Sequence, residues 1–193
     1  MTDLDGWSYE GEWRNGLQHG RGVEIEPETA DQGKGHYDGS FVNDKREGRG
    51  KETIEDLVRE GRVVYPGSTV SGIWAGGAMV GPGVWHSPRQ ELRYVGGFEE
   101  GMFDGEGQLY GKIPGRFASE FHSRPTKLRG RFEKNAFVEG TITFENRDTY
   151  TGTFAYKPGH LCCIGTGSYT EANGDVIGMS FGADGTFHGY WVE

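Results

Sequence analysis

A five-residue alternation of large, polar and glycine positions recurs along the chain. Each copy places an apolar or aromatic residue two positions before a central glycine and an aromatic residue two positions after it, as in Tyr9-Glu10-Gly11-Glu12-Trp13. Because residues i, i+2 and i+4 of a β-strand share one face, each copy predicts a strand with two large side chains flanking a bare glycine. The seven copies begin near residues 9, 37, 70, 94, 128, 150 and 176, and the last copy is degraded.

The residues after each predicted strand indicate a return of the chain. Five positions after the central glycine stands a glycine, aspartate or asparagine, the residues that best tolerate left-handed backbone, so we expect a turn with positive φ. Two further glycines follow at offsets of nine and eleven in four consecutive copies, and we expect the returning strand to begin at this pair. Each copy therefore predicts a β-hairpin. The turn residues are Gly16, Asp44, Gly77, Gly101 and Asn135, and the pairs are Gly20/Gly22, Gly48/Gly50, Gly81/Gly83 and Gly105/Gly107.

Each central glycine leaves an open floor between two rings. Gly96, for example, lies between Tyr94 and Phe98 on one face of its predicted strand. We expect a ring from a neighbouring hairpin to pack on this floor, where any Cβ would collide. A single-layer sheet cannot bury both of its faces by itself, so the remaining rings should line a groove.

Composition supports an all-β chain. Gly accounts for 35 of 193 residues, and glycine inside a helix costs about 1 kcal/mol per position, which argues against a helix bundle. A disordered chain would lack the 11 Phe, 5 Trp and 9 Tyr found here. The remaining fold class is a β protein that packs aromatic rings over glycines.

Charge and cysteine usage narrow the class of partner. The formal net charge of −9 argues against a general affinity for nucleic acid or anionic membranes, which require basic patches. Of the two basic runs, Lys45-Arg46 and Arg124 to Arg131, only the second is long enough to form a patch. Adjacent Cys162 and Cys163 rarely bridge each other, which fits a reducing compartment. The first residues lack a signal-peptide pattern and no stretch approaches the ~18 apolar residues of a membrane helix, so we expect a cytoplasmic location.

The segment from Tyr9 to Gly22, YEGEWRNGLQHGRG, resembles a MORN (membrane occupation and recognition nexus) repeat. The resemblance covers about six units over residues 7–193, and it is specific in the first four copies and weaker in the last three. It implies an elongated, twisted antiparallel sheet of successive β-hairpins with loop insertions, forming one repeat domain over residues 1–193. Such arrays fold as units stabilised by their neighbours.

Three connections are longer than the family's usual unit, at residues 24–36, 51–69 and 111–127. In the second, Thr53 with Asp56 resembles a capping box and Gly61 a helix stop, which predicts a two-turn helix. The alternative is an extra, eroded hairpin that includes residues 63–65. The third insertion holds Phe117 and Phe121, and it either wraps the sheet or contacts a partner.

The last strand is apolar on both faces. Phe187, Gly189 and Trp191 should point one way, and His188, Tyr190 and Val192 the other. A terminal repeat normally has a polar outer face, so this strand is either folded back as a cap or covered by another chain.

No residue pattern for catalysis emerges. The six histidines form no His-x-x-x-His pair, and His160 with Cys162 and Cys163 lacks the second ligand pair that structural zinc requires. The glycine pairs precede no helix, so they are not phosphate-binding loops. We therefore expect no catalytic residue, no metal and no cofactor.

The sequence predicts a non-catalytic scaffold that docks a protein partner, such as an amphipathic helix or peptide. The resemblance implies a cytoskeletal assembly such as a cilium or flagellum. A peripheral membrane adaptor that binds anionic lipid and a recruitment module for a separate enzyme are the alternatives, and a homodimer remains open. The candidate partner-binding residues are Trp13, Phe41, Trp74, Phe98, Phe132, Phe154, Phe187, Tyr190 and Trp191.

Overall fold

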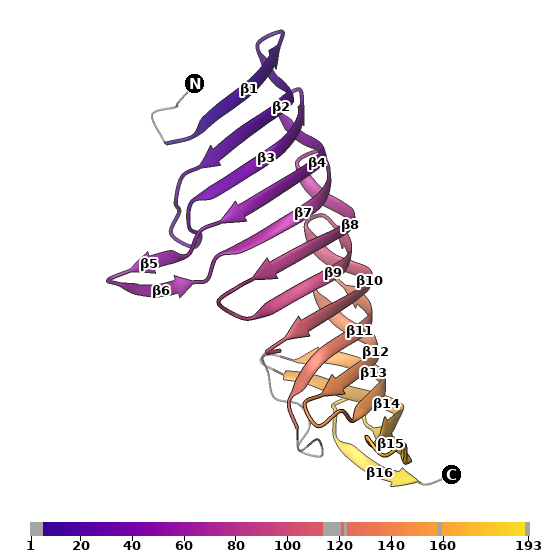
Figure 1. The fold of residues 1–193 in the computed structure, drawn as a ribbon. Helices are drawn as coiled ribbons and strands as arrows, with labels where there is room; N and C mark the ends of the chain where they lie inside the picture. Colours follow the sequence, from indigo (N-terminus) through magenta and orange to yellow (C-terminus); the bar gives the residue numbers. More distant parts are fainter. Residues whose placement is uncertain (1–5, 114–120, 122, 158–159, 192–193) are drawn as a thin grey trace. The chain divides into compact units, whose positions relative to one another are not determined.

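The computed structural model describes residues 6–113, 121, 123–157 and 160–191, and these residues form strands and turns without a helix (Figure 1). The chain divides into two compact units, with the boundary between Met102 and Phe103. We call them the N-terminal unit and the C-terminal unit. The predicted fold class, an all-β array of antiparallel hairpins, is confirmed within each unit, whereas a single domain over residues 1–193 stays a prediction.

Within each unit, consecutive strands of the sheet pair antiparallel in sequence order. The sheet of the N-terminal unit contains β1 (Ser8–Arg14), β2 (Leu17–Glu26), β3 (Gly35–Val42), β4 (Lys45–Ile54), β7 (Ser68–Ala75), β8 (Ala78–Ser87) and β9 (Leu92–Glu99). The sheet of the C-terminal unit contains β10 (Met102–Gly111), β11 (Pro125–Glu133), β12 (Ala136–Phe144), β13 (Thr149–Lys157), β14 (His160–Thr170), β15 (Val176–Phe181) and β16 (Phe187–Trp191).

The tight turns have the backbone that the sequence predicts. All five turn positions have positive φ, between 65° at Asp44 and 98° at Gly77. The residue before each also has positive φ, as in Asn15 at 53° and Asn43 at 49°, which is the pattern of a type I′ turn. The turns also tie neighbours together, because the amide of Asp44 donates to the carbonyl of Gln18 at 3.1 Å in the preceding hairpin.

The returning strands begin earlier than predicted. They start directly after the turn, as β2 does at Leu17, and the glycine pair lies inside the strand. The first glycine of each pair has positive φ, 63° at Gly20 and 74° at Gly48, and the register shifts there. This is the geometry of a β-bulge, which bends the strand without ending it.

In the first, second and sixth copies a tyrosine ring packs over the glycine floor, and this ring comes from the same hairpin. A Cβ on Gly39 would lie 2.3 Å from the hydroxyl oxygen of Tyr37 on the same strand, and a Cβ on Gly50, its partner on β4, would lie 2.2 Å from that atom. The expectation of a neighbour's ring was therefore wrong for this copy. The reason is a hydrogen bond, since the hydroxyl of Tyr37 donates to the carbonyl of Ser40 at 3.3 Å and holds the ring flat on its own strand.

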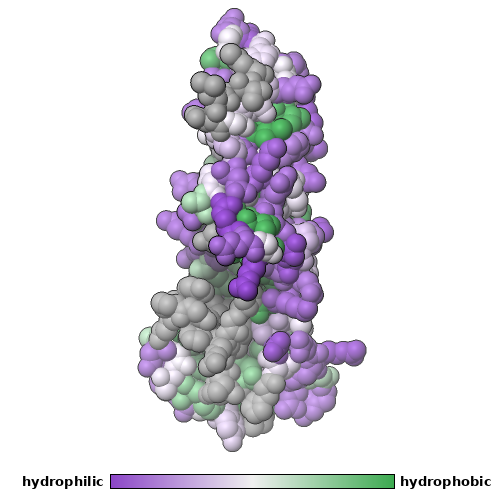
Figure 2. Space-filling view, turned by 90° about the vertical axis from the view of Figure 1, so that its left-hand side faces the viewer, coloured by the Kyte–Doolittle hydropathy of each residue, from purple (hydrophilic) through white to green (hydrophobic). Residues whose placement is uncertain are grey.

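The insertion at residues 51–69 forms a hairpin. β5 (Leu57–Arg59) and β6 (Arg62–Tyr65) pair antiparallel as a separate two-stranded sheet that projects from the N-terminal unit (Figure 1). The predicted helix is wrong and the hairpin alternative is confirmed, because Glu60 and Gly61 both have positive φ and form a turn. Leu57 is fully buried, while Val63 and Val64 are exposed. Figure 2, which looks at the side from which this hairpin projects, shows mostly hydrophilic atoms with small hydrophobic spots between them.

The insertion at residues 111–127 is described only in part, and Phe117 lies outside the described residues. Phe121, which is described, is buried among rings of the C-terminal unit. Its ring stacks on Phe144 and Tyr169 at centroid distances of 5.1 and 5.6 Å. At this one residue, the insertion packs on the sheet of its own unit.

The last strand pairs with β15, and its side chains do not alternate strictly. His188 is an extra residue between the pairs Phe181↔Phe187 and Ser180↔Gly189. Such a bulge brings Phe187 and Tyr190 to the same face, where their rings stack at 6.5 Å. Tyr190 is nevertheless 72% exposed.

Candidate partner-binding surface

Most of the predicted partner-binding rings are buried within the chain itself. The exposed fraction is 1–5% for the five central candidates, which are Phe41, Trp74, Phe98, Phe132 and Phe154. Trp13 is 48% exposed, Phe187 is half-buried, and the side chain of Trp191 lies outside the described residues. A partner could reach the five buried rings only if their packing opened.

Edge-to-face contacts link the rings of successive hairpins. Tyr9 of the first copy meets Phe41 of the second at 5.0 Å, and Tyr37 of the second meets Trp74 of the third at 5.0 Å. Such pairs contribute about 0.5–1.5 kcal/mol beyond the area that they bury. We call this side of the N-terminal sheet the ring face. Its rings couple one repeat to the next.

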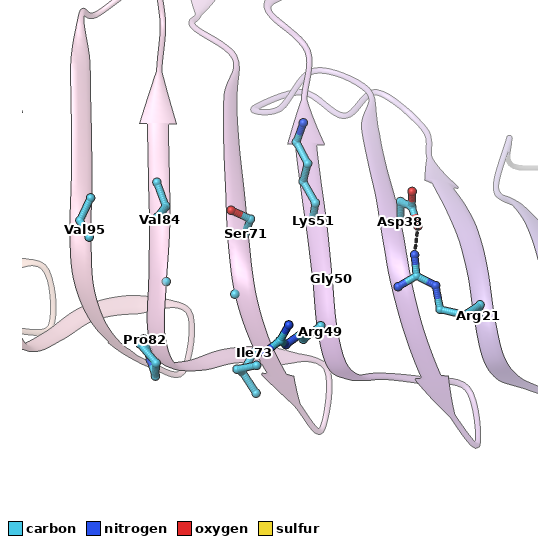
Figure 3. A pocket seen from close by; sticks show the side chains of 12 residues that line it. Arg21, Asp38, Arg49, Gly50, Lys51, Ser71, Ile73, Pro82, Val84 and Val95 are labelled. Atoms are coloured by element: carbon cyan, nitrogen blue, oxygen red, sulfur yellow. Dashed lines mark hydrogen bonds and ion pairs between the residues drawn. The ribbon is translucent and has the colours of Figure 1, made fainter.

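The opposite side of the N-terminal sheet, which we call the second face, carries an open groove. One row of side chains crosses the groove at a single register level from β3 to β9 (Figure 3). A second row lies nearer the turns. The first row consists of Asp38, Lys51, Ser71, Val84 and Val95, and the second includes Arg49, Ile73 and Pro82.

The groove has room for a segment of another chain. Its volume is about 680 Å³ and it is open along its length. Glycines of the repeat contribute to its floor, among them Gly50, Gly72 and Gly83. The ring over Gly50 lies on the ring face, so the second face stays free of it. These glycines thus lie under Tyr37 or Met79 on the ring face and leave bare backbone on the second face.

The two halves of the groove differ in chemistry. Arg21, Arg49 and Lys51 lie on β2 and β4, while the strands β7 to β9 supply mainly apolar side chains. Arg21 pairs with Asp38 at 3.1 Å, and both side chains are more than half exposed. Arg49 and Lys51 are exposed and make no ion pair with any described residue. The groove therefore has surplus positive charge at one end in a chain of net charge −9.

The groove is lined mainly by cations, glycines and apolar side chains. Its one carboxylate, Asp38, accepts a hydrogen bond from Arg21, and its one hydroxyl belongs to Ser71. General acid–base or nucleophilic catalysis requires a base within hydrogen-bond reach of the reacting group, and no such pair lines the groove. Among the described residues, no group of three or more His, Cys, Asp or Glu side chains is arranged to hold a metal ion.

One arginine on the ring face joins three glutamates. The Arg46 guanidinium bonds Glu24 and Glu52, each at 2.7 Å, and also Glu26. It lies 4.6 Å from the centre of the Tyr37 ring. Burial, and then the neighbouring glutamates, raise the pKa of Glu52, although Arg46 opposes the shift. Burial also raises the pKa of Tyr37 to about 12. The Arg46 side chain thus covers part of the ring face, and its charge is already paired with the three glutamates.

A smaller pocket in the C-terminal unit lies beside Tyr190. Its volume is about 390 Å³, and Phe121, Ile177 and Met179 supply apolar walls. Asp148 at its edge is already engaged, since the hydroxyl of Tyr169 and the amide of Ala172 donate to it. These hydrogen bonds, that of Tyr169 first, lower the pKa of Asp148. Tyr190, a predicted binding residue, thus borders this pocket.

Sequence reasoning missed the residues of the groove. The alternation that placed Tyr37, Gly39 and Phe41 on one face also places Asp38 on the other, and the same holds for Lys51 beside Gly50. The signal was therefore present in the intervening positions. Two features hid the positive charge of the groove. The chain as a whole is negative, and Arg49 and Lys51 are separated by a glycine and so form no basic run.

The described part of the chain contains no helix with the length and apolar character needed to cross a membrane. The hairpins, the coupled rings and the open groove of the second face together define a β-hairpin repeat protein. A family model for the MORN repeat matches residues 9–25, 37–56, 71–90 and 94–112. The chain is a MORN-repeat protein, and MORN repeats are typically non-catalytic modules of protein or membrane interaction. No curated protein matches it.

The four matched segments are the four copies in which the sequence resemblance is specific. The three later copies are not matched, yet each forms a hairpin, β11–β12, β13–β14 and β15–β16. In the fifth copy Leu128 takes the place of the tyrosine, and Gly130 pairs directly with Gly140 across the hairpin. The backbone pattern of the repeat thus persists where its side chains have diverged.

Proposed function

We propose that this protein is a non-catalytic scaffold that docks a protein partner on its repeat sheet. The observation that carries the proposal is the open groove of about 680 Å³ on the second face of the N-terminal unit. A scaffold needs a surface that remains free when the chain is folded. The ring face fills itself with its own rings and with Arg46, whereas the second face offers exposed cations and valines.

The partner belongs to a larger assembly, for which a cytoskeletal structure such as a cilium or flagellum is our first candidate. The resemblance to stand-alone MORN proteins supports this candidate, and such a partner would be met in the cytoplasm. A recruitment module for an enzyme differs only in the identity of the partner. Protein interfaces combine apolar anchors with polar contacts, and the groove offers apolar side chains on β7 to β9 and exposed cations on β2 and β4.

Site-specific photo-crosslinking in the source cells tests the proposal. A photoreactive amino acid replaces Ser71 at the centre of the groove, and a second variant carries it at Thr141, an outward-facing position of the C-terminal unit. We expect a discrete protein adduct from position 71 that is weak or missing from position 141. Equal adducts from both positions, or none from position 71, would overturn the proposal.

The second candidate is a peripheral membrane adaptor, because Arg49 and Lys51 could meet anionic headgroups. Vesicles that contain phosphoinositide provide the test at about 150 mM salt, where interactions between exposed charges are largely screened beyond ~8 Å. We expect weak or no binding, since the chain carries a net charge of −9. Micromolar binding that Lys51→Glu abolishes would favour the adaptor.

A further inference from the structure

We propose that the groove takes a partner segment of two parts, a short acidic block and a short apolar block. This inference rests on the proposed function and names the chemistry of its partner. The acidic block lies over Arg49 and Lys51 on β4, and the apolar block lies over Ile73, Val84 and Val95 on β7 to β9.

The charged end selects carboxylates. Arg49 and Lys51 have no ion-pair partner among the described residues, and Arg21 has only its exposed contact with Asp38. Two free cations two residues apart on one strand point to the same side, so a pair of carboxylates can meet both. Charges of this kind guide encounter and specificity, and salt weakens their contribution.

The apolar end supplies the anchor. Val84 and Val95 are direct cross-strand partners, and Val95 is 37% exposed. Ile73 lies on the neighbouring strand beside Pro82 in the second row (Figure 3). Burying an aliphatic side chain of the partner against such a cluster contributes about 1.5–3 kcal/mol if burial is complete.

The register fixes the distance between the two blocks. Lys51, Ser71, Val84 and Val95 are successive partners, so three strand steps separate the cation from the last valine. At about 4.8 Å per step this is roughly 14 Å. An extended segment covers that length in about four residues, and a helix in about ten. The blocks are therefore close together in the partner's sequence if it binds extended.

Two other occupants predict different behaviour. A membrane surface presents anionic headgroups to the cations but makes no use of a valine cluster set in line with them. A second copy of this chain would bring its own net charge of −9 near the groove, and its binding would depend on the concentration of the protein alone.

Synthetic peptides test the order of the blocks in binding to the full-length chain. The probe carries an acidic block and a leucine–valine block whose centres lie about three to four residues apart, and its control has the same composition with the two kinds of residue alternating. Fluorescence anisotropy at low and high salt gives the dissociation constants. We expect the ordered peptide to bind at least about tenfold more tightly than the alternating one.

Substitutions in the groove test which end binds the acidic block and which end binds the apolar block. Arg49→Glu with Lys51→Glu should weaken the ordered peptide at least about tenfold and remove its salt dependence. Val84→Ser with Val95→Ser should weaken it while the salt dependence remains. The matched charge control is Lys45→Glu with Arg62→Glu, which changes two exposed cations outside the groove and should leave binding unchanged.

Several results would overturn the inference. They are equal binding of the two peptides, no effect of the groove variants, an equal effect of the control pair, and binding of anionic vesicles that is insensitive to the valine changes. Self-association that the groove variants abolish would identify a second copy as the occupant. A crosslinked partner at position 71 whose capture ignores Arg49→Glu and Lys51→Glu would overturn this inference alone, whereas loss of the crosslink itself removes the proposed function.

Discussion

Two repeats, one from each unit, fill the same position with opposite chemistry. Seven residues after the central glycine, the second copy, in the N-terminal unit, has Arg46, and the fifth copy, in the C-terminal unit, has Phe137. Arg46 lies over Tyr37 and is ringed by carboxylates, whereas Phe137 packs between Phe132 and Phe154 at 5.1 and 4.9 Å. The hairpin tolerates both because its backbone is set by glycines and turns. The residue at this position decides whether a ring face is closed by ions or by apolar contact.

Truncation of Phe137, which closes the ring face by apolar contact, should have the largest effect. Phe137 is 3% exposed, so Phe137→Ala leaves a cavity between two rings and should destabilise the C-terminal unit by about 3–5 kcal/mol. Hydrogen exchange followed by mass spectrometry measures the two units separately. Phe137→Leu is the control and should cost less, because it keeps most of the volume. Equal protection of β11 to β13 in wild type and Phe137→Ala would show that this position does not close the ring face.

Replacement of Arg46, which closes the ring face by ion pairs, should have the next largest effect. Arg46→Met keeps an unbranched side chain of similar length but leaves Glu24, Glu26 and Glu52 without their cation in a partly buried site. We expect a loss of about 3 kcal/mol in urea unfolding followed by tryptophan fluorescence. Adding Glu52→Gln should recover part of it. The exposed pair Arg21–Asp38 provides the control, since Arg21→Met should cost about 0–1 kcal/mol. Similar losses of unfolding free energy for Arg46→Met and Arg21→Met would show that the buried cluster is no more stabilising than the exposed ion pair.

The glycine floors give a smaller and graded effect. Gly39→Ala would place a Cβ 2.3–2.7 Å from the rigid ring of Tyr37, whereas Gly72→Ala, at the same repeat position, first meets the flexible end of Met79 at 2.4 Å. We expect a loss of about 2–3 kcal/mol for Gly39→Ala and about half of that for Gly72→Ala. Thermal unfolding checks the order. A larger loss for Gly72→Ala would mean that rings do not define these floors.

The backbone of this fold was predictable to the level of single turns. Positive φ at Asp44 and Asn135 follows from the exchange of glycine for the two residues that best replace it. The source of the ring over Gly39 was not predictable from alternation, because a hydrogen bond of the Tyr37 hydroxyl decides it. For residues 57–65 the sequence allowed both a helix and a hairpin, because Thr53 and Asp56 resemble a capping box. Strand pairing overrides this capping pattern.

The candidate site was harder to predict than the fold. Aromatic residues dominate binding surfaces, so the rings were chosen, and the structure places five of them in the interior. Arg49 and Lys51 become neighbours of Ile73 and Ser71 only through strand register. A one-residue change in register would move these side chains to the other face, so the groove depends on the bulges at the glycine pairs, which sequence reasoning took for the starts of the returning strands.

The smallest expected effect is a difference in the response of the two units to acid. Burial raises the pKa of Glu52 above the ordinary glutamate value of 4.5, so this group contributes stability below that value and the contribution is lost as pH rises through the raised pKa. The hydrogen bond from Tyr169 lowers the pKa of Asp148 below the ordinary 3.8, so its contribution is present above that value and is lost as pH falls through the lowered pKa. The two groups therefore act with opposite sign in different pH windows.

Single neutral substitutions isolate each contribution. We expect the unfolding free energy of wild type relative to Glu52→Gln to fall as pH rises from about 4.5. Relative to Asp148→Asn, it should fall as pH drops below about 3.8. Each difference should localise to its own unit, with Glu52→Gln changing the exchange of β4 and Asp148→Asn that of β13 and β14. Difference curves of the same sign, or an effect of Glu52→Gln in the C-terminal unit, would show that the two carboxylates do not act independently in their own units.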